Sequence, residues 1–183
     1  MFVLKGGTAL CKFYNDPRFS EDIDLDSPKG NIGNIVKRFC KQYGYHSPCK
    51  KKDTLHGQKF MINYGVPGQL LKVETSHRDK MIPKFKYIII NGIRVYKLEQ
   101  IAITKLNAFI TRDKIRDLYD ITFIINHKWH LLSEETKKII KDNLLTKNLL
   151  NQNDLVIHQE DNLIDKDELE TNILSAYEKL ESS

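Results

Sequence analysis

The chain of 183 residues has little cysteine and no long hydrophobic run. Its three cysteines (Cys11, Cys40 and Cys49) form no CxxC pair, which argues against a disulfide scaffold or a cysteine-rich zinc site. No apolar run approaches the roughly 20 residues that span a bilayer, and residues 1–15 lack the layout of a signal peptide. These absences predict a reduced, cytoplasmic protein with one main core and no membrane partner.

Charge is unevenly distributed along the chain, although the net value is only +5. Residues 151–183 hold two basic and nine acidic residues, which leaves 27 basic and 15 acidic residues in 1–150. A basic body of this kind favours a polyanionic partner such as RNA or nucleotide phosphates. A general excess of solvated lysines explains the charge equally well, so charge alone does not decide the function.

Hydrophobic periodicity predicts an α/β (α+β) half followed by a helical half, with a domain boundary between residues 97 and 98. Strands are expected at 2–4, 22–26, 59–63, 69–76, 87–90 and 93–96, with a last, weakest one at 155–157. Helices are expected at 8–14, 31–43, 98–111, 114–126, 133–143 and 167–181. Ser133 is the expected N-cap of the 133–143 helix. The domains are therefore 1–97 and 98–183, the second ending in an acidic tail, 151–183.

A glycine pair lies where the first strand meets the first helix, in Lys5-Gly6-Gly7-Thr8. Glycines let a phosphate approach the backbone, and a helix N-terminus presents free N–H groups and a positive dipole end. The order differs from a Walker loop, in which lysine follows the last glycine. Most glycine pairs are only tight turns, so this motif alone is weak evidence for phosphate binding.

Acidic side chains alternate along Asp22-Ile23-Asp24-Leu25-Asp26, so Asp22 and Asp24 share one face of the strand. Hard carboxylate ligands held this close favour Mg²⁺ or Mn²⁺ over a merely exposed polar face. Glu74 would complete a three-carboxylate metal cluster if its strand lay beside this one. Such a cluster suits two-metal phosphoryl chemistry.

Charged residues of the helical half form a further candidate site. We expect Arg112, Arg116 and Asp120 to share one helix face because they are spaced four apart, which would present cations to a triphosphate or an RNA backbone. The alternative for this segment is a salt-bridged surface helix, which we favour when the segment is considered alone.

Taken together, these segments resemble the nucleotidyltransferase superfamily, and specifically the AbiEii-type abortive-infection toxins, which include the related MenT toxins. The resemblance covers residues 2 to about 126. It rests on these segments: Phe2-Val3-Leu4-Lys5-Gly6-Gly7-Thr8-Ala9-Leu10, Arg18-Phe19-Ser20-Glu21-Asp22-Ile23-Asp24-Leu25, Lys72-Val73-Glu74, Thr104-Lys105-Leu106-Asn107-Ala108 and Arg116-Asp117-Leu118-Tyr119-Asp120-Ile121.

The resemblance implies a nucleotidyltransferase fold, a short mixed sheet with flanking helices followed by a helical C-terminal part. It also implies magnesium-dependent transfer of NMP from an NTP, with the acceptor end of tRNA modified by related toxins. The implied roles are phosphate binding for Gly6, Gly7 and Thr8, metal binding for Asp22, Asp24 and Glu74, and catalytic roles for Lys105, Asp117 and Asp120. Lys5, Arg18, Ser20 and Arg116 are expected to assist nucleotide binding.

Two features depart from the family pattern or lie outside it. Family members carry a helical segment ahead of the glycine pair, whereas five residues precede it here, so we expect a truncated or a shortened start. The acidic tail is expected to be a solvated helix, the alternative being that it covers a basic active-site face.

The function hypothesis is therefore a toxin-like nucleotidyltransferase acting on RNA, with tRNA as the expected acceptor and a cognate antitoxin as a possible partner. The densest basic–aromatic stretch expected to track the RNA comprises Lys37, Arg38, Lys41, Tyr43, Tyr45 and Lys50–Lys52. Two alternatives stay open: a catalytically inert RNA- or antitoxin-binding module, and transfer to a protein or small-molecule hydroxyl. A zinc site at His46, Cys49 and His56 is a remote further alternative because it lacks a fourth ligand.

Overall fold

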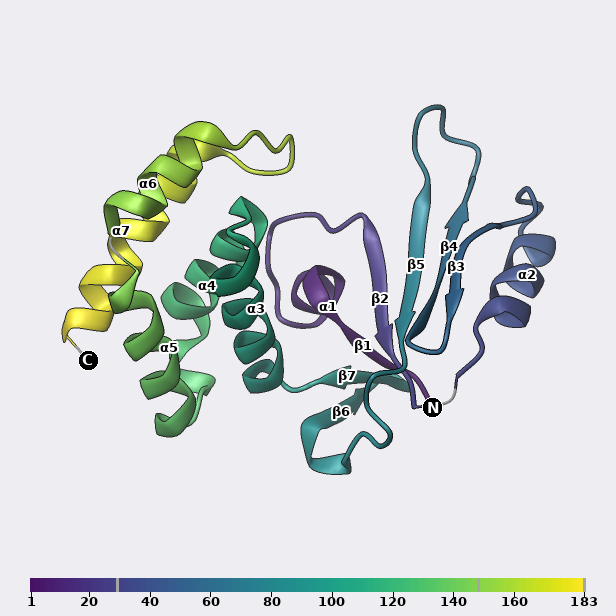
Figure 1. Ribbon diagram of the computed structural model, residues 1–183, viewed down its shortest axis with the longest axis horizontal. Coiled ribbons are helices and arrows are strands. Elements are labelled where there is room, and N and C mark those ends of the chain that lie inside the picture. Colours follow the sequence, from purple (N-terminus) through teal and green to yellow (C-terminus); the bar gives the residue numbers. More distant parts are fainter. Residues whose placement is uncertain (29, 148, 183) are drawn as a thin grey trace. The chain divides into compact units, whose positions relative to one another are not determined.

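The alternating segments of the N-terminal half form one mixed sheet in the computed structural model (Figure 1). The structure describes residues 1–28, 30–147 and 149–182; residues 29, 148 and 183 belong to the predicted domains but lie outside the described residues. The chain forms a sheet unit, Met1–Asn15 with Phe19–Lys97, and a helical unit, Asp16–Arg18 with Leu98–Ser183. Residues 16–18, predicted in the sheet domain 1–97, belong to the helical unit.

The sheet has seven strands in the order β3-β4-β5-β2-β1-β7-β6. They are β1 (Val3–Lys5), β2 (Asp22–Asp26), β3 (Cys49–Thr54), β4 (Gly57–Ile62), β5 (Leu71–Ser76), β6 (Tyr87–Ile90) and β7 (Ile93–Tyr96). β2 pairs with β5 and β1 with β7 in parallel, and the other neighbours are antiparallel. The β6–β7 hairpin turns at Asn91-Gly92, as this dipeptide predicts.

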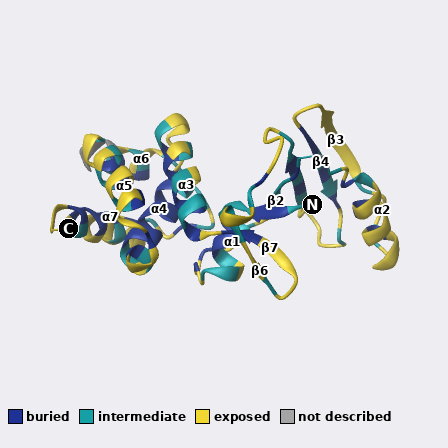
Figure 2. Ribbon diagram, turned by 90° about the horizontal axis from the view of Figure 1, so that it is seen from below, coloured by how far each residue is buried: buried dark blue, intermediate teal, exposed yellow. Residues whose placement is uncertain are grey.

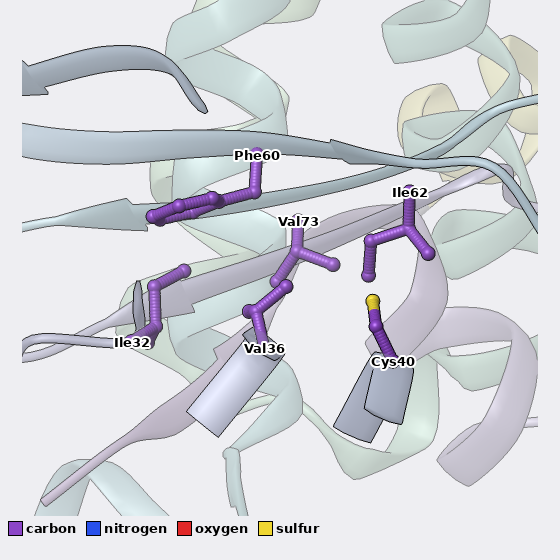
Figure 3. Close-up of a cluster of buried hydrophobic side chains, with 6 residues drawn as sticks. All are labelled: Ile32, Val36, Cys40, Phe60, Ile62 and Val73. Atoms are coloured by element: carbon purple, nitrogen blue, oxygen red, sulfur yellow. The ribbon is translucent and has the colours of Figure 1, made fainter. Parts of the chain in front are cut away.

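Two helices of the sheet unit, α1 (Gly6–Phe13) and α2 (Gly33–Gln42), follow β1 and β2 in the chain, and a short 3-10 helix, η1 (Lys84–Lys86), precedes β6. α2 buries its apolar side against β4 and β5, where a hydrophobic cluster excludes water. Figure 3 shows this cluster of Ile32, Val36, Cys40, Phe60, Ile62 and Val73. Because successive strand residues point to opposite faces, this core face leaves Asp22, Asp24 and Glu74 on the other face. We call the latter the carboxylate face.

The helical unit contains α3 (Leu98–Arg112), α4 (Ile115–Lys128), η2 (Trp129–Leu131), α5 (Glu134–Thr146), α6 (Leu149–His158) and α7 (Lys166–Ser182). α4 is buried over most of its length. The predicted N-cap is confirmed: the Ser133 side chain accepts a hydrogen bond from the Thr136 N–H. Among the residues that the structure describes, no helix is long and apolar enough to cross a membrane.

The structure differs from the sequence predictions in three respects. The segment expected as a strand at 155–157 lies inside α6, and β3 was not predicted at all. β3 was missed because it is exposed along its whole length, as Figure 2 shows, and so has no apolar alternation. The acidic tail is not a merely solvated helix, because α7 buries one side of itself in the helical unit. Its buried residues are Leu169, Ile173, Ala176, Tyr177 and Leu180.

Candidate active site

The carboxylates of β2 and β5 lie in adjacent strands, as the metal hypothesis requires. In the parallel pairing Asp24 is the register partner of Glu74, and Asp22 is the register partner of Lys72. Register partners in neighbouring strands point to the same face of a sheet. The structure therefore brings three predicted site residues, Asp22, Asp24 and Glu74, to one face of the sheet unit.

Asp24 has an environment that disfavours its negative charge. Burial raises the pKa of its carboxyl, and the neighbouring carboxylates of Asp22 and Glu74 raise it further, while Lys72 and Lys5 act in the opposite direction. Two or more carboxylates held together in this way favour a bound cation, since the cation removes their mutual repulsion. The three carboxylates therefore form a set of oxygen donors of the kind that suits a cation.

Lys72 neutralises part of this charge in the structure. Its ammonium group forms an ion pair with the Asp22 carboxylate. Burial acts to lower the pKa of Lys72, but the hydrogen bond and charge of Asp22, together with Asp24 and Glu74, raise it. The lysine thus remains a cation beside the predicted metal ligands.

The third aspartate of β2 is engaged elsewhere. Asp26 accepts a hydrogen bond from the Lys5 ammonium at 2.5 Å and another from the Tyr96 hydroxyl at 3.0 Å. Burial and the Asp26 charge raise the pKa of Tyr96, so this phenol stays protonated. Lys5 therefore lies on the carboxylate face but is directed at Asp26, and the structure does not bring it to the glycine pair as a free cation.

The donor set fits a hard divalent cation, although its ligands are not gathered in advance. Within residues 1–28, 30–147 and 149–182, no three acidic, histidine or cysteine side chains converge closely enough to hold a metal. The same observation leaves the remote zinc hypothesis for His46, Cys49 and His56 without support. Asp22 forms an ion pair with Lys72. A cation at this site would therefore have to displace that lysine or share the Asp22 carboxylate with it.

The glycine pair adjoins these carboxylates. Gly6 opens α1 with φ of +72°, and a Cβ built at this position would lie 2.9 Å from Asp24 Oδ2. Glycine is required here both by the left-handed backbone and by the close approach of Asp24. The first N–H groups of a helix have no intrahelical partner, so the start of α1 can donate to phosphate oxygens beside the carboxylate face.

Two hydroxyl residues connect the start of α1 to the start of β2. Thr8 Oγ1 donates a hydrogen bond to the backbone carbonyl of Asp22 and lies 3.0 Å from Ser20 Oγ. These contacts hold the glycine turn against the aspartate strand. Thr8 and Ser20, both predicted to bind nucleotide, are therefore placed next to the predicted metal ligands and also have a structural role there.

The remaining predicted acids and lysine form a buried charge network in the helical unit. Lys105 forms ion pairs with Asp120 and, at 3.6 Å, with Asp117. Arg18 donates to Asp120 Oδ1 from Nε at 3.0 Å and from Nη2 at 2.7 Å, while Arg112 forms a bidentate pair with Asp117 at 2.6 and 2.9 Å. Each aspartate is thus neutralised by two cations, which accounts for its complete burial.

The predicted common face of Arg112, Arg116 and Asp120 is wrong. Arg112 ends α3 whereas Arg116 and Asp120 lie four apart in α4, so helical spacing relates the latter two residues but does not place Arg112 with them. Arg116 pairs through its guanidinium with Asp161, which comes from the acidic tail. Arg18, expected to assist nucleotide binding, is instead buried against Asp120. Sequence spacing could not reveal these partners, because they lie 45 and 102 positions away.

The predicted basic–aromatic stretch is part helix and part strand. The rings of Phe39, Tyr43 and Tyr45 lie 4.8 to 6.1 Å apart at the end of α2, with Tyr43 and Tyr45 stacked. Lys50–Lys52 lie on β3, which is exposed along its whole length. The sheet unit thus presents exposed aromatic rings and lysines.

Comparisons with known proteins agree with this fold. A crystal structure from H. pylori, described as that of a candidate nucleotidyltransferase, superposes with a TM-score of 0.78 at 27% identity, covering 99% of this chain and 87% of that one. JHP933 from Helicobacter pylori gives a TM-score of 0.74 at 28% identity over 99% of this chain and 84% of that one. Among curated proteins, none matches the chain.

The mixed sheet, the glycine turn entering α1 and the paired aspartates of β2 define a nucleotidyltransferase of the toxin–antitoxin class. The chain belongs to the family of AbiEii nucleotidyl transferase toxins of type IV toxin–antitoxin systems, whose model matches residues 1–176. The match extends through most of the acidic tail, well past residue 126, where the resemblance seen in the sequence ended. The tail is therefore part of the family's fold, and the family identifies an antitoxin as a partner class.

Proposed function

We propose that this protein transfers a nucleoside monophosphate from an NTP to an RNA acceptor, with tRNA as the acceptor class, in a reaction that requires Mg²⁺ or Mn²⁺. The observation that carries this proposal is the adjacency of Asp24, its register partner Glu74 and the glycine that opens α1. A nucleotidyltransferase needs a cation site next to a phosphate-binding turn, and this arrangement provides the residues for both.

The carboxylates of Asp22, Asp24 and Glu74 would hold the cation. A divalent cation bound there supplies charge neutralisation for the phosphoryl group and lowers the pKa of an attacking hydroxyl. The protein's own contribution is orientation. Gly6 packs closely against Asp24 and so fixes the distance between the phosphate-binding turn and the carboxylates. With a cation held by these carboxylates, the Lys72 ammonium group would be free of Asp22 and could bind the phosphates.

The phosphates of the NTP would bind at the N-terminus of α1. Gly6 and Gly7 expose backbone N–H groups there, and the positive end of the helix dipole favours an anion. Thr8 and Ser20 keep this turn against β2 through their hydroxyl contacts. The turn and the carboxylates thus belong to one rigid part of the sheet unit.

The roles of Lys105, Asp117 and Asp120 follow from the resemblance. In the helical unit these three charges neutralise one another together with two arginines. Arg116 would act on nucleotide only after releasing Asp161. We therefore assign the cation and triphosphate chemistry to the sheet unit. The charge network of the helical unit has, above all, the role of stabilising its own fold.

The test is incubation of purified protein with each labelled NTP, Mg²⁺ and total RNA, beside Asp24→Asn and a control, Asp53→Asn. Asp53 is an exposed residue of β3 on the core face, so its loss leaves the candidate site intact. Label on a tRNA-sized band is expected with wild type and Asp53→Asn but not with Asp24→Asn. The Asp24→Asn variant should fold normally, because it removes a charge that its surroundings disfavour.

Three outcomes would contradict the proposal. Equal labelling by Asp24→Asn would refute the assignment of that carboxylate. Absence of label on every RNA, with label transferred to protein or to a small-molecule hydroxyl, would refute the RNA acceptor. Calorimetric titration showing that neither Mg²⁺ nor NTP binds would favour an inert binding module.

A further inference from the structure

A row of charged side chains crosses the carboxylate face of the sheet from one strand to the next. Lys52 of β3 is the register partner of Lys59 of β4. Lys59 is also the partner of Glu74 on β5, and Glu74 is the partner of Asp24 on β2. Lys5 of β1 follows as the partner of Asp24. Since register partners point to the same face, the central acids have lysines on both sides.

The two lysines on the β3 side differ from the other lysines of the row and its surroundings. Lys5 is paired with Asp26 and Lys72 with Asp22, but no carboxylate of the described residues lies within ion-pair distance of Lys52 or Lys59. Like charges directly opposite each other in a sheet are destabilising. Placing two ammonium groups opposite each other, neither of them in an ion pair, next to the candidate site is a cost that an anionic ligand would offset.

The positions of Lys52 and Lys59 indicate which of the two anionic substrates, the NTP or the RNA acceptor, these lysines would bind. The glycine turn that would bind the triphosphate adjoins Asp24 on the β1 side, whereas Lys59 and Lys52 extend from Glu74 toward the edge strand β3. With strands about 4.8 Å apart, this row reaches about 14 Å from Asp24 to Lys52. In phosphoryl transfer the attacking and leaving oxygens lie roughly in line on opposite sides of the phosphorus. The β3 side is therefore the side of the acceptor.

We propose that Lys59 and Lys52 bind the phosphodiester backbone of the RNA acceptor next to its reacting end. This inference rests on the proposed function and names the part of the sheet that holds its acceptor. The lysine row carries no sequence-reading group, so it positions the strand without selecting its bases. An ammonium suits this task because it is a compact point charge for phosphate oxygens.

The first experiment measures binding without catalysis. Fluorescence anisotropy with a labelled single-stranded RNA and with tRNA is recorded over a range of salt concentrations, without NTP. Lys52→Ala/Lys59→Ala is compared with Lys84→Ala/Lys138→Ala, which removes the same charge from exposed positions in η1 and α5. Each lost phosphate contact lowers the slope of log K against log salt by about 0.7 for a single strand, so the first variant should lose about 1.4. The control should keep the wild-type slope.

The second experiment measures labelling of RNA at varied acceptor and varied NTP. The KM for the acceptor should rise in Lys52→Ala/Lys59→Ala while the KM for NTP stays unchanged, and Lys52→Arg/Lys59→Arg should restore binding. A rise in the NTP KM alone would assign the two lysines to the triphosphate and overturn the proposal. Equal slope losses in both double variants would overturn it as well, since binding would then depend on charge wherever it lies.

The two proposals can fail separately. RNA labelling that is insensitive to both lysines refutes the lysine row and leaves the transferase standing. A slope loss specific to Lys52 and Lys59 in a protein that labels no RNA supports the row as an RNA-binding surface and refutes the transfer of nucleotide to RNA.

Discussion

Lys72 of β5 lies directly beside Asp22 of β2, and its ammonium group contacts the carboxylate that would otherwise be free to bind a cation. A lysine in this position competes with a metal ion for the same oxygens. If a metal ion binds here as proposed, it would have to displace the Lys72 ammonium group from Asp22.

Replacing Lys72 by methionine should therefore strengthen the binding of Mg²⁺ or Mn²⁺ in the absence of nucleotide. The pair is partly exposed and such pairs contribute up to about 1 kcal/mol, so we expect an affinity gain of up to about fivefold. Calorimetric titration of the purified variant measures it. Lys50→Met, which affects an exposed pair on the other face, is the control and should bind like wild type. A weaker metal affinity in Lys72→Met would show that the lysine assists binding instead of competing.

Gly6→Ala should destabilise the protein and reduce its activity. The new Cβ would meet Asp24 Oδ2 at 2.9 Å on a backbone with φ of +72°. Gly92→Ala is the matched control, since it has φ of +79° and no atom within 4 Å of the added Cβ. The free energy of unfolding of the control should fall by about 1 kcal/mol from backbone strain alone. Chemical denaturation should show a larger loss for Gly6→Ala, and an equal loss would mean that Asp24 moves aside without cost.

Lys105→Met should destabilise the helical unit strongly. Removing the lysine leaves Asp117 and Asp120, both fully buried, with less compensation for their charge, and breaking a buried pair of this kind costs about 3 kcal/mol. Lys137→Met breaks the pair with the exposed Glu134 and should cost less than about 1 kcal/mol. Urea unfolding of both variants measures the difference. Similar midpoints would mean that Arg18 and Arg112 neutralise the two aspartates without help.

Asp16 should make the free energy of unfolding depend on pH. Burial raises the pKa of its carboxyl to about 6, and the Asp120 charge contributes, whereas the Arg18 N–H and guanidinium act in the opposite direction. The native state therefore holds a proton that the unfolded chain releases near 3.8. The resulting stabilisation is complete below about pH 4 and is lost as the pH rises through 6, with a magnitude on the order of 3 kcal/mol.

The Asp16→Asn variant tests this origin of the pH dependence. Its amide carbonyl can still accept from the Arg18 N–H, as Asp16 Oδ1 does at 2.9 Å, but the side chain does not ionise. Denaturant unfolding of wild type and variant between pH 4 and 7.5 should give a flatter profile for the variant. Parallel profiles would assign the pH dependence to other groups.

Much of the sheet unit could be predicted from local patterns. The Asp22–Asp26 strand, the hairpin at Asn91-Gly92 and the start of the 98–112 helix follow from alternation, turn chemistry and helical periodicity, which act over a few residues. The same alternation placed Asp22, Asp24 and Glu74 on the faces where the structure has them. Local patterns failed for β3, whose side chains are all exposed, and for 155–157, where a short apolar run is ambiguous between strand and helix.

The sequence by itself determined the residues of the candidate site, the glycine turn and the division into a sheet half and a helical half, because these depend on neighbours in the chain. Only the tertiary structure decided which of these charged side chains pair with one another. It placed Lys72 against Asp22, Lys59 beside Glu74 and Arg18 against Asp120. Strand register and buried ion pairs join residues far apart in sequence, and which charges neutralise one another is decided when the chain packs.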